Sequence, residues 1–256
     1  MKTKLIILGC GSSIGVPRID NYWGKCNKNN KKNRRSRCSA IIIKDNNLIL
    51  IDTSPDLKNQ LLVNKIKNIS SVIYSHDHAD QTHGIFELRP FYWKNNKKID
   101  VYGNKQTIIS LKKRFSYLFE NVGTYRPFLK PHIIKKSFSL GERDNKVNFK
   151  TIIVKHGRVK TVGYIFENTA YLSDCNDLSI INMKQLKILK YLILDCLRVE
   201  KAPTHFILKE ALYVHSILKP KKTILTNLSL QFDYKNLTQK LPFNVHVAYD
   251  GLKLIL

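Results

Sequence analysis

A cluster of residues able to bind a metal ion directly follows an apolar segment in the first third of the chain. Residues 72–74 are apolar and typical of a buried strand, and His76, His78 and Asp80 follow them at alternate positions. Alternate side chains of an extended backbone point the same way, so we expect these three to converge. Two imidazoles and a carboxylate suit a divalent ion of the zinc type. The alternative is a polar loop whose histidines only meet solvent, but so dense a cluster at a strand end favours a functional site.

The segments around this cluster resemble a known family. Residues 75–84 resemble the H-x-H-x-D-H signature of the metallo-β-lactamase superfamily. Residues 8–17, 51–56 and 248–251 (LGCGSSIGVP, IDTSPD and AYDG) resemble the branch containing the phosphoribosyl cyclic phosphodiesterase of phosphonate breakdown. The resemblance covers nearly the whole chain in order. It implies an α+β fold, namely a four-layer αββα sandwich formed by one domain over residues 1–256, and a hydrolase that uses a metal-activated water.

The resemblance also implies ligands from distant parts of the chain. His156 follows an apolar segment and would be the third imidazole, the alternative being a surface histidine. Asp174 ends another such segment and would bridge two metal ions, the alternative being a helix cap. Asp52 would support the metal loop by hydrogen bonding, unless it too only caps a helix. We therefore predict a tight first metal position, with zinc as the expected ion, made by His76, His78, His156 and Asp174.

Two residues depart from the family pattern, and both belong to the second metal position. Gln81 stands where the signature has a histidine after Asp80, and Asn227 stands where the family often has a late histidine. An amide oxygen binds zinc far less well than an imidazole does, but it suits harder ions. We therefore expect the second position, made by Asp80, Asp174 and these amide oxygens, to be weak or selective for Mn²⁺ or another divalent ion. His83 either reaches into this position or faces solvent.

Other residues are candidates for catalysis and substrate binding. Asp80 is expected to orient the attacking water. His205 matches a histidine motif of the branch and is the candidate general acid or phosphate contact, an ordinary histidine at a helix start being the alternative. Arg34, Arg35 and Arg89 are the candidate substrate-binding residues, against the alternatives of solvated charges or structural ion pairs.

The chain is strongly basic, with a formal net charge of +25. Such a charge attracts a phosphate-bearing substrate and makes RNA a candidate partner, although drift toward lysine in an A/T-rich genome is the alternative explanation. A homodimer is compatible with the sequence. No apolar run approaches the roughly 20 residues of a membrane span, and the first strand-like segment is too short for a secretion signal. We therefore expect a cytoplasmic protein without a membrane partner.

The five cysteines are scattered and odd in number, so we expect a reducing compartment and no disulfide framework. Cys10, Cys175 and Cys196 adjoin apolar segments and are predicted to lie in the core. Cys26 and Cys38 lie in a basic segment where, in this branch, a close group of cysteines can hold a structural zinc. Cys26 has no such close partner, so we predict that this zinc site is absent.

The rest of the chain is predicted to form strands and helices in two halves. Residues 40–43 and 48–51 are expected to form a hairpin, followed by a helix with Pro55 in its first turn. Further helices are expected at 107–119, 178–190 and 206–218. Further strands are expected at 99–102, 131–134, 147–154, 162–166, 170–172, 191–194, 223–225, 245–248 and 252–256.

The leading functional hypothesis is a metal-dependent phosphodiesterase acting on a small cyclic or nucleotide-like ester. The basic charge favours an RNA-processing nuclease similar to the tRNA 3′-end-processing ribonuclease, but we see no long inserted arm with a Gly-Pro-rich tip. Thioester hydrolysis, as in glyoxalase II, is a third enzymatic alternative. Gln81 and Asn227 also leave open a degenerate member that binds a nucleotide or nucleic acid without turnover.

Overall fold

Two seven-stranded β-sheets form the centre of the molecule. The computed structural model describes residues 2–256. In sheet order, the first sheet contains β14 (Leu252–Ile255), β1 (Lys4–Gly9), β2 (Ser39–Lys44), β3 (Asn47–Ile51), β4 (Ser71–Ile73), β5 (Ile99–Gly103) and β6 (Leu129–Ile133). The second contains β13 (Val245–Val247), β12 (Lys222–Thr226), β11 (Tyr191–Asp195), β10 (Thr169–Leu172), β9 (Val159–Phe166), β8 (Val147–His156) and β7 (Ser137–Leu140).

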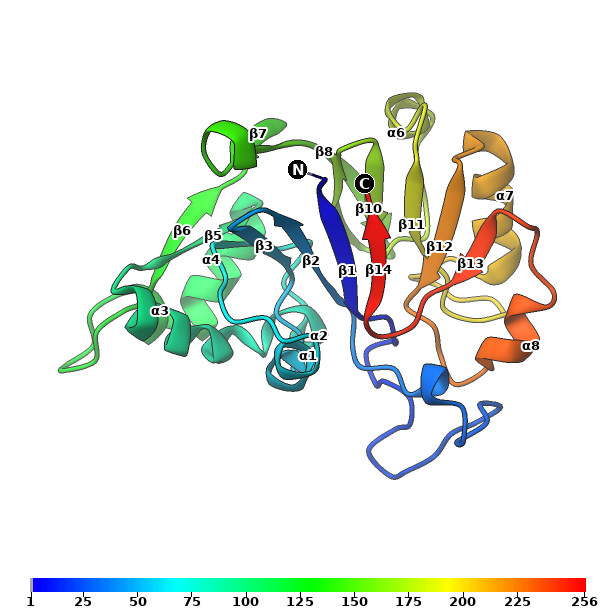
Figure 1. Cartoon of the computed structure of the whole chain (residues 1–256), viewed down its shortest axis with the longest axis horizontal. Helices are drawn as coiled ribbons and strands as arrows, with labels where there is room; N and C mark the ends of the chain where they lie inside the picture. Colours follow the sequence, from blue (N-terminus) through cyan, green and yellow to red (C-terminus); the bar gives the residue numbers. More distant parts are fainter. Residues whose placement is uncertain (1) are drawn as a thin grey trace.

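Helices cover the outer sides of the two sheets (Figure 1). The helices of the first half are α1 (Leu57–Val63), α2 (Ala79–Thr82), α3 (Arg89–Asn95), α4 (Lys105–Arg114) and α5 (Ser116–Phe119). Those of the second half are α6 (Ile180–Gln185), α7 (Leu208–Leu218) and α8 (Tyr234–Thr238). Short 3-10 turns lie at Lys31–Asn33, Ile85–Leu88 and Arg143–Asn145. No helix within residues 2–256 is both long enough and apolar enough to cross a membrane.

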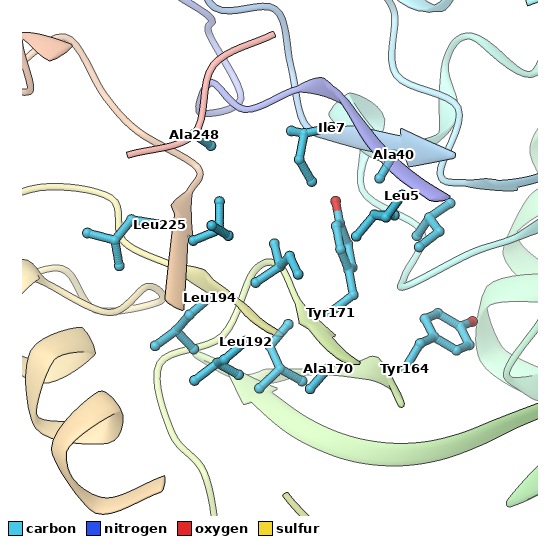
Figure 2. Close-up of a cluster of buried hydrophobic side chains, with 14 of the residues drawn as sticks. Leu5, Ile7, Ala40, Tyr164, Ala170, Tyr171, Leu192, Leu194, Leu225 and Ala248 are labelled. Atoms are coloured by element: carbon cyan, nitrogen blue, oxygen red, sulfur yellow. The ribbon is translucent and has the colours of Figure 1, made fainter. Parts of the chain in front are cut away.

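The sheets pack face to face because each presents apolar side chains to the other. Along β8, buried and exposed residues alternate on either side of Thr151, where the alternation shifts by one residue, as expected for a strand with one face in the core and a local irregularity. Figure 2 shows Leu5 and Ile7 of the first sheet pointing into the same interior as Tyr171, Leu192 and Leu194 of the second. A second apolar cluster lies between the first sheet and its helices. The resulting layers confirm the predicted αββα sandwich.

Most predicted elements are present, and the differences have local causes. The 40–51 hairpin is confirmed as the antiparallel pair β2 and β3, whereas Pro55 precedes α1, whose cap is Asp56. The helix expected at 107–119 is broken at Phe115, whose φ of −128° is not helical. Helix α6 ends at Gln185, far short of residue 190, because Leu186 turns into the core. Strand β7 and helices α3 and α8 were not predicted, since their short segments lack a clear apolar period.

The turn before β14 anchors the loop that follows β1. The two carboxylate oxygens of Asp250 accept hydrogen bonds from the backbone N–H of Cys10 at 3.1 Å and from the backbone N–H of Ser36 at 2.7 Å. Gly11 lies in this loop, where an added Cβ would come within 2.9 Å of the Arg35 carbonyl oxygen. The loop is therefore held tightly against the basic segment of the same chain.

Replacing Asp250 by alanine should lower the free energy of unfolding by about 2–3 kcal/mol, because it leaves buried N–H groups of Cys10 and Ser36 unpaired. Urea titration followed by circular dichroism measures the loss. Replacing the exposed Asp144 by alanine is the control, for which we expect a change within about 0.5 kcal/mol. Equal stabilities of the two variants would contradict the anchoring role of Asp250.

Candidate metal centre

The candidate site lies where strands of both sheets end. Asp52 follows β3, Asp174 lies just beyond β10, and Asn227 follows β12. The φ angles of these three residues are 60°, 51° and 59°, a left-handed conformation that Asp and Asn adopt more readily than most residues. A backbone hydrogen bond of 2.9 Å from Val162 to Ser75 joins the two sheets at this point. Ends of strands from both sheets are thus held together at one place.

Three imidazoles converge at this point, two expected from the sequence pattern and the third, His156, from the family resemblance. His76, His78 and His156 each offer one ring nitrogen, and these nitrogens lie within 4.8 Å of one another. The ring centroids of His76 and His78 are 4.4 Å apart, and that of His156 lies 5.4 and 5.1 Å from them. His76 and His156 are buried, whereas His78 is half-buried. Such spacing leaves room for one ion among the nitrogens.

Hydrogen bonds fix the two buried imidazoles in a form that can bind a metal ion. Nδ1 of His156 lies 2.7 Å from the carbonyl oxygen of Thr204, so Nδ1 carries the proton and Nε2 keeps its lone pair. Nδ1 of His76 lies 3.0 Å from the hydroxyl of Ser75, which itself donates to Asp52 at 2.8 Å. The hydroxyl therefore accepts the Nδ1 proton of His76. In metal sites, such partners commonly orient the ligating histidines.

The free nitrogen of His76 is the clearest sign that a cation belongs here. Its Nε2 is buried and has no hydrogen-bond partner in the described chain. Burial lowers the pKa of His76 to about 4, so the imidazole is neutral at physiological pH. An unpartnered buried nitrogen is costly unless something binds it. The donor set of three neutral imidazoles beside a carboxylate therefore fits a divalent ion.

Asp174 and His205 lie beside the imidazoles. One oxygen of Asp174 belongs with His156 and His205 to a second group whose potential ligand atoms lie within 4.8 Å of one another. Nδ1 of His205 lies 2.9 Å from the carboxylate of Asp195, while its Nε2 lies 4.0 Å from Asp174. Burial opposes a charge on His205, but the hydrogen bond and charge of Asp195, with the charge of Asp174, raise its pKa to about 9. His205 is therefore a cation beside the candidate metal position.

Asp80 and Gln81 lie on helix α2, so the extended alternation expected from the sequence ends at His78, the residue before the helix. The amide Nε2 of Gln81 donates to Asp80 at 3.1 Å and to Asp174 at 3.2 Å. Burial, reinforced by the charge of Asp174, raises the pKa of Asp80 to about 6. In this arrangement the donor end of the Gln81 amide faces the carboxylates, so the amide oxygen expected to bind a second ion is turned away from them.

Asn227 lies on the other side of Asp174. Its Oδ1 accepts a hydrogen bond from the thiol of Cys38, and its amide stabilises the charged form of Asp174 by hydrogen bonding. The oxygen expected to bind a second ion is thus turned to a thiol. Cys38 is 1% exposed and lies directly beneath this part of the site. The three cysteines predicted to be core residues, Cys10, Cys175 and Cys196, are confirmed as buried.

Two further candidates lie outside the cluster. His83 is exposed at the end of α2, and its ring packs edge-on against Phe115 with centroids 5.9 Å apart, so it does not reach the metal position. The guanidinium of Arg35 is buried and donates to the carbonyl oxygens of Phe232 and Ser229 at 2.7 and 3.3 Å. With 1% of its surface exposed, Arg35 ties loops together and cannot meet a phosphate in solution. The predicted substrate role of Arg35 is therefore wrong.

The other two arginines line separate cavities. Arg34 lies over the ring of Trp23 at 5.2 Å and, with Lys31 and Arg37, lines a cavity of about 450 Å³. Arg89 lies between the rings of Trp93 and Tyr125 in another cavity, of about 550 Å³. Neither cavity is lined by a candidate metal ligand. Arg89 is therefore not placed to bind a substrate at the histidine cluster.

Sequence reasoning missed several residues that orient this site. Ser75 and Thr204 hold His76 and His156 through hydrogen bonds, and Asp195 holds His205. Of these, only Asp195 carried a detectable signal, because a carboxylate ends the apolar segment 191–194 just as Asp52 ends another. The partners of the other histidines are set by loop geometry, which no local pattern encodes.

Comparison with known proteins agrees with this fold and site. Residues 47–226 match the model of the beta-lactamase superfamily domain. The chain therefore belongs to the metallo-β-lactamase superfamily and is a hydrolase of that fold, with His and Asp groups suited to a divalent metal ion.

Within the superfamily, the chain is similar to a solved diphosphatase of the PhnP family. The two chains are 32% identical, with a TM-score of 0.91 over 100% of this chain and 98% of the other. This likeness places the chain in the PhnP family.

Two structures at 15% identity share the fold alone. Zinc-bound PqqB from Methylobacterium extorquens has a TM-score of 0.81 over 99% of this chain and 100% of the other. The short form of human tRNase Z has a TM-score of 0.70 over 98% of each chain.

One relative is named for a transferase and not for a hydrolase. The chain is 29% identical over 257 residues to an octanoyltransferase from Porphyromonas gingivalis, covering 99% of this chain and 51% of that protein. The chain thus spans about half the length of this relative. The name of the whole relative does not tell which reaction belongs to the matched half.

Proposed function

We propose that this protein is a phosphodiesterase that holds zinc at His76, His78, His156 and Asp174 and cleaves a small cyclic or nucleotide-like phosphodiester. The observation that carries the proposal is the convergence of three imidazoles with a buried, unpartnered nitrogen on His76. The likeness to a PhnP-family diphosphatase supports a phosphate-containing substrate. The net charge of +25 would draw such an anion toward the protein.

In the proposed mechanism, each residue around the histidine cluster has a separate role. A divalent ion there would supply a nucleophile at neutral pH by lowering the pKa of water from 15.7 to about 7. The carboxylate of Asp80 would orient the attacking water. His205 would donate its Nε2 proton to the leaving oxygen. Asp195, which accepts from Nδ1 of His205 at 2.9 Å, would keep that ring in position.

Metal analysis combined with substrate comparison tests the proposal. We expect purified protein to contain zinc and to hydrolyse bis(p-nitrophenyl) phosphate, with activity lost on chelation and restored by zinc. A glutathione thioester, assayed in parallel, should not be turned over. Turnover of the thioester instead of the phosphodiester would show a thioesterase. Bound metal without turnover of either substrate, or no bound metal at all, would contradict an active phosphodiesterase and favour a binding protein.

An RNA-processing nuclease is the second candidate, and Arg89 is the observation that favours it. Its guanidinium lies 4.6 and 4.7 Å from the ring centroids of Trp93 and Tyr125 and makes no hydrogen bond or ion pair with any residue in 2–256. Arginine and aromatic side chains together suit a nucleic-acid strand. If RNA is the substrate, affinity should fall by about 10³-fold or more between 50 and 200 mM salt. Absence of RNA binding at low salt would exclude the nuclease and favour a small phosphodiester as the substrate.

A further inference from the structure

We propose that this protein binds one metal ion per chain, and that the side-chain amides of Gln81 and Asn227 take the place of a second cation beside Asp174. The inference rests on the ligand set of the proposed function and concerns only the metal content. It differs from the expectation of a weak second ion, because the amides act as hydrogen-bond donors that replace the ion.

The amide of Gln81 lies between two carboxylates. Its Nε2 lies 3.1 Å from a carboxylate oxygen of Asp80 and 3.2 Å from one of Asp174. Only the N–H end of an amide is attracted to two carboxylates, because its carbonyl oxygen would be repelled by both. An amide nitrogen has no lone pair available for a cation. Gln81 therefore joins the two carboxylates in the way that a shared cation would.

Gln81 is held in this position by its surroundings. Its side chain is fully buried, and its backbone carbonyl oxygen accepts a hydrogen bond of 2.8 Å from the N–H of Thr53. A second ion would have to displace the amide from between Asp80 and Asp174 without letting it reach water. Its Oε1 is buried and has no partner in the described chain. Turning the amide to use this oxygen would give up both carboxylate hydrogen bonds.

Asn227 is hydrogen-bonded to Cys38. The thiol of Cys38 donates to Oδ1 of Asn227, which directs the amide nitrogen toward Asp174. Asp174 thus accepts a hydrogen bond from the amide of Gln81 at 3.2 Å, and the amide of Asn227 adds to the stabilisation of its charged form.

The remaining donors do not complete a second site. Within residues 2–256, the groups of potential ligands that converge are His76, His78 and His156, and His156, Asp174 and His205. Both groups share His156, and the second adds Asp174, a ligand of the proposed first position, and His205, which is hydrogen-bonded to Asp195. Neither includes Asp80 or Cys38. The geometry therefore provides ligands for one ion and hydrogen-bond donors in place of the next.

The test is the metal content of purified protein, measured by mass spectrometry after zinc loading and gel filtration. We expect one equivalent per chain for the parent and two for the Gln81→His/Asn227→His double variant. Histidine is among the residues that tolerate a positive φ, such as the 59° of Asn227, so the backbone can accept the change. Gln106→His, at an exposed position on α4, controls for the addition of a histidine and should stay at one equivalent.

A nearly isosteric variant guards against misfolding of the double variant. Gln81→Glu keeps the shape of the side chain but removes its donors and places a third carboxylate beside Asp80 and Asp174, so we expect a second equivalent of Zn²⁺ or Mn²⁺. Two tight equivalents in the parent would overturn the inference, as would a single equivalent in both folded variants. The content is measured without substrate, so failure of phosphodiester hydrolysis would leave the result standing.

Discussion

Replacing His78 by alanine should remove the bound metal and abolish hydrolysis while leaving the protein folded. Changes to residues that merely support a ligand already cost about 10–100-fold in metal affinity, so loss of a ligand should cost more than 100-fold. Removal of a single hydrogen-bond donor that stabilises a transition state typically lowers kcat by about 10²–10³-fold. Loss of the metal ion removes a larger stabilising group, so turnover should fall by about 10³-fold or more. The fold should survive because His78 is half-buried at the start of α2 and outside both apolar clusters.

The measurement is zinc content and bis(p-nitrophenyl) phosphate turnover, with circular dichroism as the check on folding. His83→Ala is the matched control, because His83 lies on the same segment but is exposed and packs on Phe115. It should keep its metal and most of its activity. A His78→Ala protein that still binds a full equivalent of zinc would show that the three imidazoles do not form the metal position.

The metal-binding part of the site could be predicted because its signal is local. His76 and His78 are separated by one residue after an apolar strand, and His156 and Asp174 end or follow apolar strands of their own. Such patterns fix both the strand and the place where it ends. The facing sheets were implied by the family resemblance, together with strand-like segments in both halves of the chain.

What could not be predicted depends on contacts between distant residues. The sequence shows that Gln81 and Asn227 replace histidines, but not which end of each amide faces Asp174. The orientation of each amide follows from its hydrogen bond, that of Gln81 with Asp80 on α2 and that of Asn227 with Cys38. Arg35 illustrates the same limit, since a basic run predicts solvated charges, yet this guanidinium is buried against backbone carbonyl oxygens nearly 200 residues away along the chain.

Replacing His205 by alanine should lower turnover by about 10²–10⁴-fold for substrates with a strongly basic leaving group, without loss of zinc. His205 is held by Asp195 at 2.9 Å, and its ring centroid lies 4.6 Å from that of His156. It is therefore close enough to the proposed metal position to protonate a leaving oxygen. It is not one of the three imidazoles that converge there.

The leaving group separates acid catalysis from simple binding of phosphate. A p-nitrophenolate leaves without needing a proton, so His205→Ala should retain most of its kcat on bis(p-nitrophenyl) phosphate and lose it on an alkyl diester. A group that only binds phosphate would instead raise KM by similar factors for both substrates. Asp195→Asn should show a weaker form of the same leaving-group dependence, because Asp195 acts only by orienting His205. Equal losses of kcat on the two diesters would contradict the role of His205 as the general acid.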